Sequence, residues 1–401
     1  MERVALSIGG KSPRRTAVDA LTHAGAPRFR ALYVHVPFCA HKCHYCDFYS
    51  IVDSEDRAEA FVERLESEMD EALKFIVEPL ETVFIGGGTP TLIGESLVRR
   101  MISGLRRRFA MIDGAEFTVE ANPETVNAPM ARALMESGAT RVSLGAQSFD
   151  PALLSTLERW HHPESVARAV GLLREAGIPS INLDLIYGIP GSTIEQWELD
   201  LDRTIALKPD HISAYGLVYE PNTPLAVKLR TGKVTKLAEE LEVAQCAAAC
   251  GRLASAGFER YEISNWGRRG HRCRHNLLYW ENADWWALGP SASAHASGVR
   301  WKNVPRLSDW LSEGPLASVQ DIEVLDDDAR VGEVFMLGLR LIDGIPLDRV
   351  ESLLTVGSRG LARRHALARF TREGLLVRDA SALRLSASGL LLADTVLCEL
   401  V

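Results

Sequence analysis

Three cysteines in one short segment, Cys39, Cys43 and Cys46, have the spacing from which metal chemistry is expected. The spacing is C-x3-C-x2-C, and the segment directly follows an apolar run, Leu32–Val36, that is typical of a buried strand. Three thiolates at this spacing can hold three irons of a cubane iron–sulfur cluster and leave the fourth iron without a protein ligand. Because an open iron can bind a small molecule, the segment predicts a redox-active ligand site.

Three alternatives compete for these cysteines. A zinc ion could add His35, His41 or His44 to them, although structural zinc usually draws on two separated ligand pairs. A disulfide is disfavoured because the chain has seven cysteines, an odd number, and no secretory signal. Covalent haem attachment needs a histidine directly after the last cysteine of C-x-x-C, and this chain has Asp47 there. The spacing and the position after a strand therefore favour the cluster.

The composition of the chain excludes several classes of protein. Its 401 residues are 46% hydrophobic and 24% charged, which is ordinary for a globular protein of two or three domains. No run approaches the about 18 apolar residues of a membrane helix, so an integral membrane protein is not expected. The net charge of −8 argues against nucleic acid as a partner. Residues 1–30 are expected to be a flexible N-terminal extension, and the unpaired cysteines indicate the cytoplasm.

Alternating patterns indicate the elements that must position the cysteines. Short β-branched runs predict strands at Ala31–Val36, Thr82–Ile85, Glu116–Glu120, Arg141–Leu144, Ser180–Ile186 and His211–Val218. Apolar residues at helical spacing predict intervening helices, among them Glu95–Arg108, Ala128–Ser137, Pro163–Ala176, Thr193–Ala206 and Leu237–Ala256. Strands that alternate with helices form parallel sheets with right-handed crossovers. The predicted fold class is therefore α/β, with an open partial (β/α)6 barrel.

Unusual residues cluster in the segments that follow these strands. After the first strand come the cysteines, and after the second comes Gly86–Thr91. Later strands end at Glu120 or just before Gln147, and Asp184 lies on the fifth. In parallel α/β folds, ligands bind at the carboxyl ends of the strands, where these segments converge. Each feature is weak alone, but their shared register predicts one ligand-binding mouth.

The combination resembles the radical S-adenosylmethionine (SAM) superfamily, and Tyr33–Cys39 is among its most specific stretches. The resemblance implies a [4Fe-4S] cluster on the three cysteines and SAM on its open iron, where one electron cleaves SAM to a 5′-deoxyadenosyl radical. It also implies that Tyr45 packs beside the adenine and that glycines allow close approach to the methionyl end. The SAM contacts implied by position are Tyr33, Tyr45, Gly87, Gly88, Thr89, Glu120, Gln147, Arg159 and Asp184.

Within the superfamily, the chain resembles the branch of oxygen-independent coproporphyrinogen III oxidases and HemW-type heme chaperones. The oxidases carry a further cysteine two residues after the third ligand, where this chain has Phe48. The segment His275–Trp280 resembles the H-N-x-x-Y-W signature of the chaperones, which implies haem contacts through His275, Tyr279 and Trp280. The alternative is a histidine hydrogen-bonded in the core, with the aromatic rings simply packing.

The resemblance implies a heme chaperone that delivers haem to acceptor proteins such as respiratory-chain components. It is compatible with transient membrane association and with a homodimer. One alternative is a coproporphyrinogen III oxidase that decarboxylates porphyrinogen propionates; another is a radical SAM tRNA-modifying enzyme, which the acidic charge disfavours.

The expected domain organisation follows the same pattern. Residues 31–227 should form the radical SAM core and 228–310 an accessory region with the H-N-x-x-Y-W motif. Residues 311–401, with helices followed by a small hairpin, should form an α+β winged-helix-like domain. Cys246 and Cys250 lie one helical turn apart among alanines and are expected to be small core residues.

Overall fold

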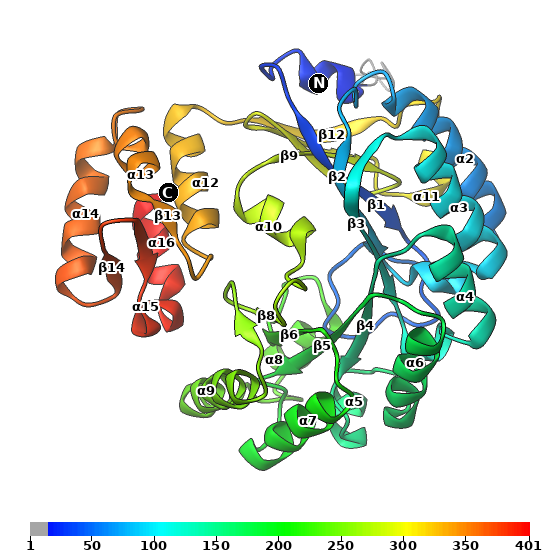
Figure 1. The fold of residues 1–401 in the computed structure, drawn as a ribbon, viewed down its shortest axis with the longest axis horizontal. Coiled ribbons are helices and arrows are strands. Elements are labelled where there is room, and N and C mark those ends of the chain that lie inside the picture. The colour runs from blue at the N-terminus through cyan, green and yellow to red at the C-terminus, as the bar shows by residue number, and fades with distance from the viewer. Residues whose placement is uncertain (1–14) are drawn as a thin grey trace, which may run out of the picture.

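The computed structural model describes residues 15–401, and one curved 12-stranded sheet dominates it (Figure 1). Six of its strands follow in chain order and pair in parallel, each with the next. They are β1 (Phe29–Val36), β2 (Leu80–Gly87), β3 (Met111–Ala121), β4 (Arg141–Gln147), β5 (Ser180–Tyr187) and β6 (His211–Gly216). The predicted strands are confirmed within a few residues, with β3 starting earlier and β6 ending earlier than expected.

Helices cover the outer face of this curved sheet (Figure 1). The helices between successive strands are α2 (Ala58–Ala72), α3 (Glu95–Arg108), α4 (Ala128–Ser137), α5 (Pro151–Thr156), α6 (Pro163–Glu175) and α7 (Ile194–Ala206), with 3-10 turns η1 (Pro90–Ile93) and η2 (Pro123–Thr125). Each helix buries one apolar stripe; in α2, Phe61, Leu65 and Met69 are fully buried. The open partial (β/α)6 barrel is therefore confirmed.

The register of the parallel strands keeps their carboxyl ends level. Val36 of β1 pairs with Gly87 of β2, and Asp184 of β5 pairs with Gly145 of β4. The segments that carry the cysteines, the glycines and the carboxylates therefore leave the sheet at one edge.

The region after β6 adds strands to both edges of the sheet. The strand β9 (Asp284–Leu288) pairs in parallel with β1, and β10 (Ser293–Ala296), β11 (Val299–Asn303) and β12 (Val319–Val324) continue antiparallel. At the other edge, β8 (Asn265–Gly267) and β7 (Glu259–Arg260) extend β6. The helices of this region are α8 (Pro224–Arg230), α9 (Glu239–Ser255), α10 (Arg274–Trp280) and α11 (Leu307–Leu311). The added strands cover the main-chain edges of β1 and β6, which would otherwise stay unpaired. The expected boundaries of the accessory region, 228 and 310, fall inside α8 and α11.

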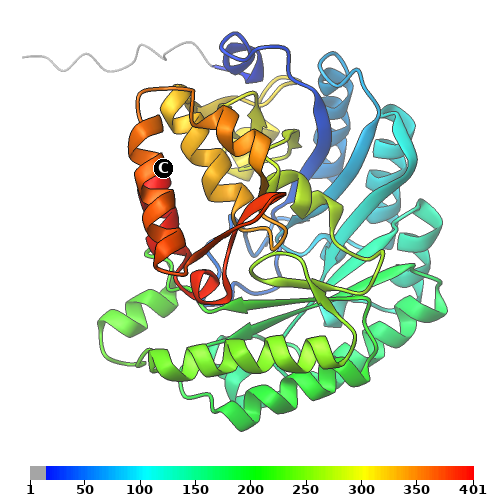
Figure 2. The same ribbon diagram turned by 60° about the vertical axis from the view of Figure 1, so that its left-hand side comes forward.

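The C-terminal part has its own small sheet and core, set beside the barrel (Figure 2). The order is α12 (Asp327–Gly338), β13 (Ile345–Pro346), α13 (Leu347–Leu353), α14 (Gly360–Arg372), β14 (Leu376–Arg378), β15 (Ala382–Leu385), α15 (Ala387–Leu391) and α16 (Ala393–Leu400). Phe335, Val350 and Phe370 are buried at its centre. Three helices before a β14–β15 hairpin are the arrangement expected of a winged-helix-like domain. This part starts at α12, because β12 still belongs to the large sheet.

The prediction of a flexible extension over residues 1–30 is wrong for its second half. Residues 15–30 contain α1 (Ala17–Leu21) and the start of β1. Ala17 and Ala20 are buried in the main core, and Thr16 forms a β-bridge with Ser318. Small side chains let this segment pack closely on the sheet; residues 1–14 lie outside the described part. Within residues 15–401, no helix combines the length and apolarity needed to cross a membrane.

Gly289, after β9, is a stringent packing position. Its φ is +93°, and an added Cβ would lie 2.5 Å from the carbonyl oxygen of His35 on β1. We expect Gly289→Ala to lower the free energy of unfolding by about 2 kcal/mol or more, because both the backbone and the strand pairing resist it. Denaturant unfolding measures this. Gly171→Ala in α6, where nothing lies within 4 Å of the added Cβ, should be neutral or stabilising; equal stability of both variants would contradict the prediction.

Candidate cofactor-binding site

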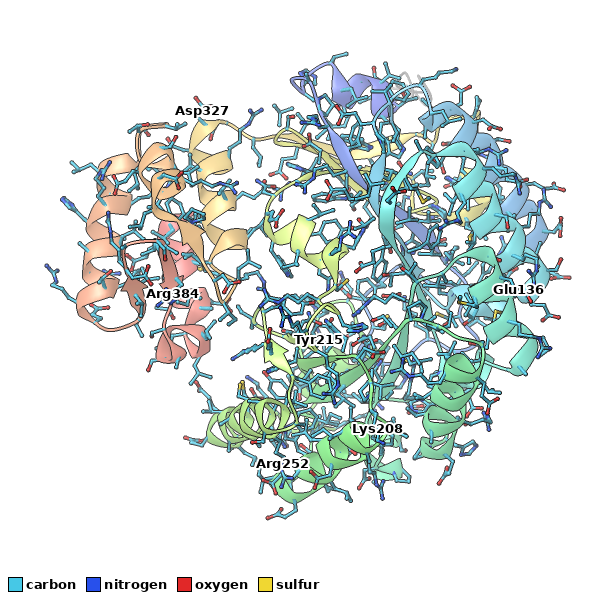
Figure 3. All side chains as sticks on the ribbon, viewed as in Figure 1. Glu136, Lys208, Tyr215, Arg252, Asp327 and Arg384 are labelled. Atoms are coloured by element: carbon cyan, nitrogen blue, oxygen red, sulfur yellow. The ribbon has the colours of Figure 1, made fainter. Side chains whose placement is uncertain are left out.

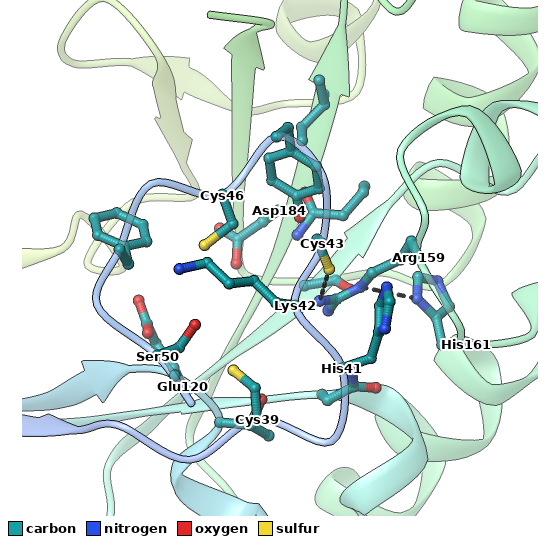
Figure 4. Close-up of a pocket in the computed structure, with 18 of the residues that line it drawn as sticks. Cys39, His41, Lys42, Cys43, Cys46, Ser50, Glu120, Arg159, His161 and Asp184 are labelled. Carbon is teal, nitrogen blue, oxygen red and sulfur yellow. Dashed lines mark hydrogen bonds between the residues drawn. The ribbon is translucent and has the colours of Figure 1, made fainter. Parts of the chain in front are cut away.

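A cavity of about 660 Å³ opens at the carboxyl ends of β1–β6. Cys39, Cys43 and Cys46 line it, and Figure 4 shows their sulfur atoms turned toward the same space. Eight of the predicted SAM-contacting residues line the same cavity: Tyr45, Gly87, Gly88, Thr89, Glu120, Gln147, Arg159 and Asp184. The convergence expected from the sequence is therefore present, while each contact with SAM stays a prediction.

Tyr33, the remaining predicted SAM contact, is placed elsewhere. Its hydroxyl lies 3.0 Å from Nδ1 of His35, and its ring packs near Phe84, with ring centroids 6.3 Å apart. His35 also reaches the carbonyl oxygen of Tyr49 with Nε2, at 2.8 Å. In this conformation, Tyr33 does not line the cavity. It contacts His35, which in turn contacts the main chain at Tyr49.

Main-chain hydrogen bonds fix the cysteine segment. The amide of Cys39 donates to the carbonyl of Ile51 at 2.9 Å, and the amide of Cys46 donates to the carbonyl of Cys43 at 3.2 Å. Burial raises the pKa of the Cys39 thiol, and it raises the pKa of Cys46 to about 11. Without a metal these thiols stay protonated at neutral pH, so metal binding must release their protons.

The arrangement of donors distinguishes a cluster from its alternatives. Within residues 15–401, no three His, Cys, Asp or Glu side chains converge on a point that one metal ion could occupy. All seven cysteines are free thiols. His35, a candidate zinc ligand, has both ring nitrogens engaged. A cubane cluster binds each cysteine through a separate iron, so its three thiolates do not have to meet at one ion. The residues present therefore fit an iron–sulfur cluster better than zinc.

Arg159 places a positive charge beside the cysteines. Its Nη1 lies 3.6 Å from Sγ of Cys43, Nη2 donates to the carbonyl of Gly145 at 2.9 Å, and Nε faces Nδ1 of His161 at 3.2 Å. These contacts hold the guanidinium in place (Figure 4). A fixed cation favours thiolates and an anionic cluster, so Arg159 is suited to balance the charge of the cysteine segment.

The glycine segment lies in close contact with the cysteine segment. The amide of Gly88 donates to the carbonyl of Val36 at 2.8 Å, and that of Thr89 donates to the carbonyl of Phe38 at 2.7 Å. A Cβ on Gly88 would lie 2.6 Å from the Phe38 oxygen. Only glycine fits at this approach, which joins the two cofactor-facing segments.

Two buried carboxylates face the cavity. Glu120 accepts a hydrogen bond from the amide of Gly87 at 3.0 Å, and burial, with the charge of Asp184 nearby, raises its pKa to about 7. Burial also raises the pKa of Asp184, although Ser143 and Asn182 donate to it at 2.9 and 2.7 Å. Both groups are acceptors for a ligand that carries hydroxyl or ammonium groups.

A buried hydrogen-bonded chain continues from Asp184 through the barrel. Asn182, which donates to Asp184, faces Nδ1 of His211 through its own oxygen at 2.6 Å. Nε2 of His211 faces the hydroxyl of Tyr261 at 2.8 Å, and that hydroxyl accepts from the amide of Cys273 at 3.3 Å. Cys273 is the N-cap of α10. The chain therefore joins the cavity wall to the helix with the H-N-x-x-Y-W motif.

The structure places that motif away from the cavity. His275 is only 1% exposed, with Nδ1 2.8 Å from the Thr82 hydroxyl and Nε2 2.8 Å from the Tyr279 hydroxyl. Trp280 stacks under the guanidinium of Arg340, 4.5 Å from the ring centre. In this conformation His275 has no free nitrogen for an iron, which is the arrangement of the alternative stated above.

The sequence did not single out several cavity-lining residues. Trp160 is 66% exposed at the mouth, stacked on His41 with ring centroids 4.0 Å apart. Tyr215, from the end of β6, lies toward the middle of the molecule, whereas Glu136, Arg252 and Asp327 lie at its periphery (Figure 3). The sequence held two signals that could have indicated them: Trp160 directly follows Arg159, and Tyr215 lies in the predicted sixth strand.

Comparisons with known proteins agree with this geometry. The model of the Radical SAM superfamily matches residues 33–203, and that of the HemN C-terminal domain matches 325–392. The protein "Heme chaperone HemW" of Mycobacterium tuberculosis H37Rv is 35% identical over 92% of this chain and 94% of its own length. The proteins of that name from Bacillus subtilis and Escherichia coli are each 31% identical over 92% of this chain, covering 98% and 97% of their own lengths. The structure of E. coli coproporphyrinogen III oxidase (HemN) covers 96% of this chain and 92% of its own with a TM-score of 0.82, at 21% identity, which shows a shared fold.

The partial barrel and its cysteine-lined mouth define a radical SAM protein. Within that superfamily, the chain belongs to the HemW family. Membership of the superfamily implies a [4Fe-4S] cluster and SAM as cofactors, and the donors described above fit both.

Cys43→Ser tests the cluster assignment. We expect anaerobically reconstituted protein to fall from about four irons per chain to few or none and to lose its broad visible absorbance, because one of three ligands is missing. Iron and sulfide assays measure the loss, and unfolding of the metal-free chain checks that the fold persists. Cys398→Ser, at an exposed cysteine far along the chain, is the control. Unchanged iron and sulfide in Cys43→Ser would refute the assignment.

Proposed function

We propose that this protein is a heme chaperone, which binds haem and transfers it to acceptor proteins. The observation that carries the proposal is identity of 31–35% to proteins named heme chaperones along more than nine-tenths of the chain. We further propose that the acceptors include respiratory-chain components, that the protein acts in the cytoplasm with transient membrane association, and that it forms a homodimer.

The alternative function is that of an oxygen-independent coproporphyrinogen III oxidase. The likeness to the HemN structure supports only the fold, because identity is 21%. Phe48, which occupies the place of the oxidases' further cysteine, is 62% exposed and lines the cavity. At this position the chain has an apolar ring where the oxidases have a thiol, and this difference favours the chaperone.

We propose that the cluster and SAM occupy the cavity of the core, residues 31–227. Cys39, Cys43 and Cys46 would hold the cluster and Arg159 would balance its charge. Glu120 and Asp184 would accept hydrogen bonds from SAM, while Gly87 and Gly88 would allow its close approach. When bound, the cluster supplies the electron that cleaves SAM.

We propose that haem meets the motif of His275, Tyr279 and Trp280 on α10, beside the winged-helix-like part that starts at α12. Because both nitrogens of His275 are engaged, axial ligation requires its ring to leave Thr82 or Tyr279. Burial lowers the pKa of His275 to about 3, so the ring is neutral where it lies, and a neutral imidazole is the form that binds iron. Arg340, over the Trp280 ring, supplies a positive charge for a haem propionate.

Hemin binding by the reconstituted protein tests the function. We expect a Soret band that stays with the protein through gel filtration and passes to an apo-haem acceptor protein on mixing. Parallel anaerobic assays with coproporphyrinogen, SAM and a reductant should give no decarboxylated product. Product formation without haem retention would establish the oxidase and end the chaperone proposal.

A pair of variants tests the haem motif. Thr82→Val removes the hydroxyl that holds Nδ1 of His275, so we expect hemin to bind about threefold to tenfold more tightly. His275→Ala should weaken binding and alter the Soret spectrum. Spectral titration measures both. If both variants give the wild-type spectrum, another residue is the axial ligand. That result would not contradict haem binding by the protein.

A further inference from the structure

Three of the seven cysteines line the cofactor cavity, and the other four lie elsewhere. Cys246 and Cys250, which the sequence predicted as small core residues, are only partly buried on α9. Cys273 is buried and Cys398 is exposed. The surroundings of the three cavity thiols are therefore the ones that bear on the cofactor.

Each of the three cavity thiols has a hydrogen-bond donor of the protein beside it. Nη1 of Arg159 lies 3.6 Å from Sγ of Cys43. The main-chain amide of Phe48 acts on Cys46, where it lowers the pKa against the effect of burial. The third thiol, that of Cys39, differs from these two because side-chain hydroxyls approach it.

Two hydroxyls lie near Cys39. Oγ1 of Thr89 is 3.7 Å from its Sγ. Burial raises the pKa of the Cys39 thiol, and the hydroxyls of both Thr89 and Ser50 act against that rise. Ser50 lines the cavity and is 8% exposed, and its buried oxygen has no hydrogen-bond partner within residues 15–401. Because a buried hydroxyl without a partner costs free energy, Ser50 is available to bond once the cavity is occupied.

The main chain holds Ser50 in place on both sides. Nε2 of His35 donates to the carbonyl of Tyr49 at 2.8 Å. The carbonyl of Ile51 accepts from the amide of Cys39 at 2.9 Å, which keeps the residue after Ser50 paired with the first cysteine. The hydroxyl of Ser50 is thus positioned near Cys39 without any hydrogen bond of its own (Figure 4).

The direction of these hydrogen bonds follows from the chemistry of the ligand. A thiol can donate or accept, but the thiolate that binds a metal has no proton and only accepts. A hydroxyl beside a metal-bound cysteine must therefore be the donor. Such a bond withdraws electron density from the sulfur and favours the reduced, more negative state of an iron–sulfur cluster.

We propose that the Ser50 hydroxyl donates a hydrogen bond to the Cys39 thiolate and thereby raises the reduction potential of the cluster. Ser50 acts through the cluster ligand, so it is a positioning residue and not a catalytic one. The proposal rests on the cluster placement proposed above, and it does not depend on haem binding. Ser50 supplies a donor for Cys39, as Arg159 does for Cys43.

Redox titration of the anaerobically reconstituted full-length protein, in the absence of SAM, tests this role. In Ser50→Ala we expect the ratio of reduced to oxidised cluster at a fixed potential to fall about threefold to tenfold, because one hydrogen bond to the ligand is lost. For a one-electron couple, this lowers the midpoint potential by up to about 59 mV. The EPR signal of the reduced cluster measures the midpoint, which does not depend on the fraction of protein that is loaded.

Two further variants make the comparison specific. Ser50→Thr keeps a hydroxyl and should restore the wild-type midpoint. Ser137→Ala removes a buried hydroxyl that donates within α4, to the carbonyl of Ala133 at 2.6 Å, and should leave the midpoint unchanged. A wild-type midpoint in Ser50→Ala would overturn the proposal, and weaker SAM binding by that variant would then assign the hydroxyl to SAM.

Iron and sulfide assays on the same preparations keep this proposal separate from the cluster assignment. A wild-type protein that takes up no iron would refute the assignment and this proposal with it. Loss of all iron from Ser50→Ala alone would overturn only the proposal, because the hydroxyl would then be needed for assembly of the cluster. None of these results bears on haem binding.

Discussion

The arrangement of the cofactor cavity depends on one constraint. The glycine segment after β2 lies in close contact with the cysteine segment after β1. Two main-chain hydrogen bonds, from Gly88 to Val36 and from Thr89 to Phe38, bring the segments together. A side chain at position 88 would overlap the Phe38 carbonyl. Because main-chain bonds at this distance leave little freedom, they hold the residues that directly precede Cys39 against the glycine segment. Backbone geometry thus sets where the cysteine segment begins, beside the glycine segment.

A chain of buried hydrogen bonds runs from the cavity wall to α10. Asp184 on the cavity wall, His211 on β6 and Tyr261 before β8 are joined by buried hydrogen bonds that end at the N-cap of α10. Each member is satisfied only while its neighbours stay in place, so the chain favours one orientation of all of them. The wall of the cofactor cavity and the helix of the H-N-x-x-Y-W motif are therefore parts of one hydrogen-bonded unit.

The sequence predicted what depends on local spacing and strand ends. The cysteine segment, the glycines, Glu120 and Asp184 all lie at the predicted mouth, because parallel strands bring their carboxyl ends together. The sequence did not predict the pairing of β9 with β1. Those strands are about 250 residues apart, and their pairing depends on tertiary structure and not on local sequence. The sequence motifs predicted ligand contacts for Tyr33 and His275. In the structure both side chains form hydrogen bonds with protein neighbours instead, His35 and Thr82, and the spacing of residues did not indicate this.

The charges in the cavity select the kind of ligand that it can hold. Glu120 and Asp184 are both buried, and the charge of Asp184 adds to burial in raising the pKa of Glu120. A cation placed between them would relieve this repulsion, whereas an anion would add to it. Arg159 lies beside Cys43, where three thiolates and a cluster would concentrate negative charge. The cavity thus offers carboxylates to a cationic group and a guanidinium to an anionic centre. The sulfonium and ammonium groups of SAM match the carboxylates in charge, and an anionic iron–sulfur cluster matches Arg159.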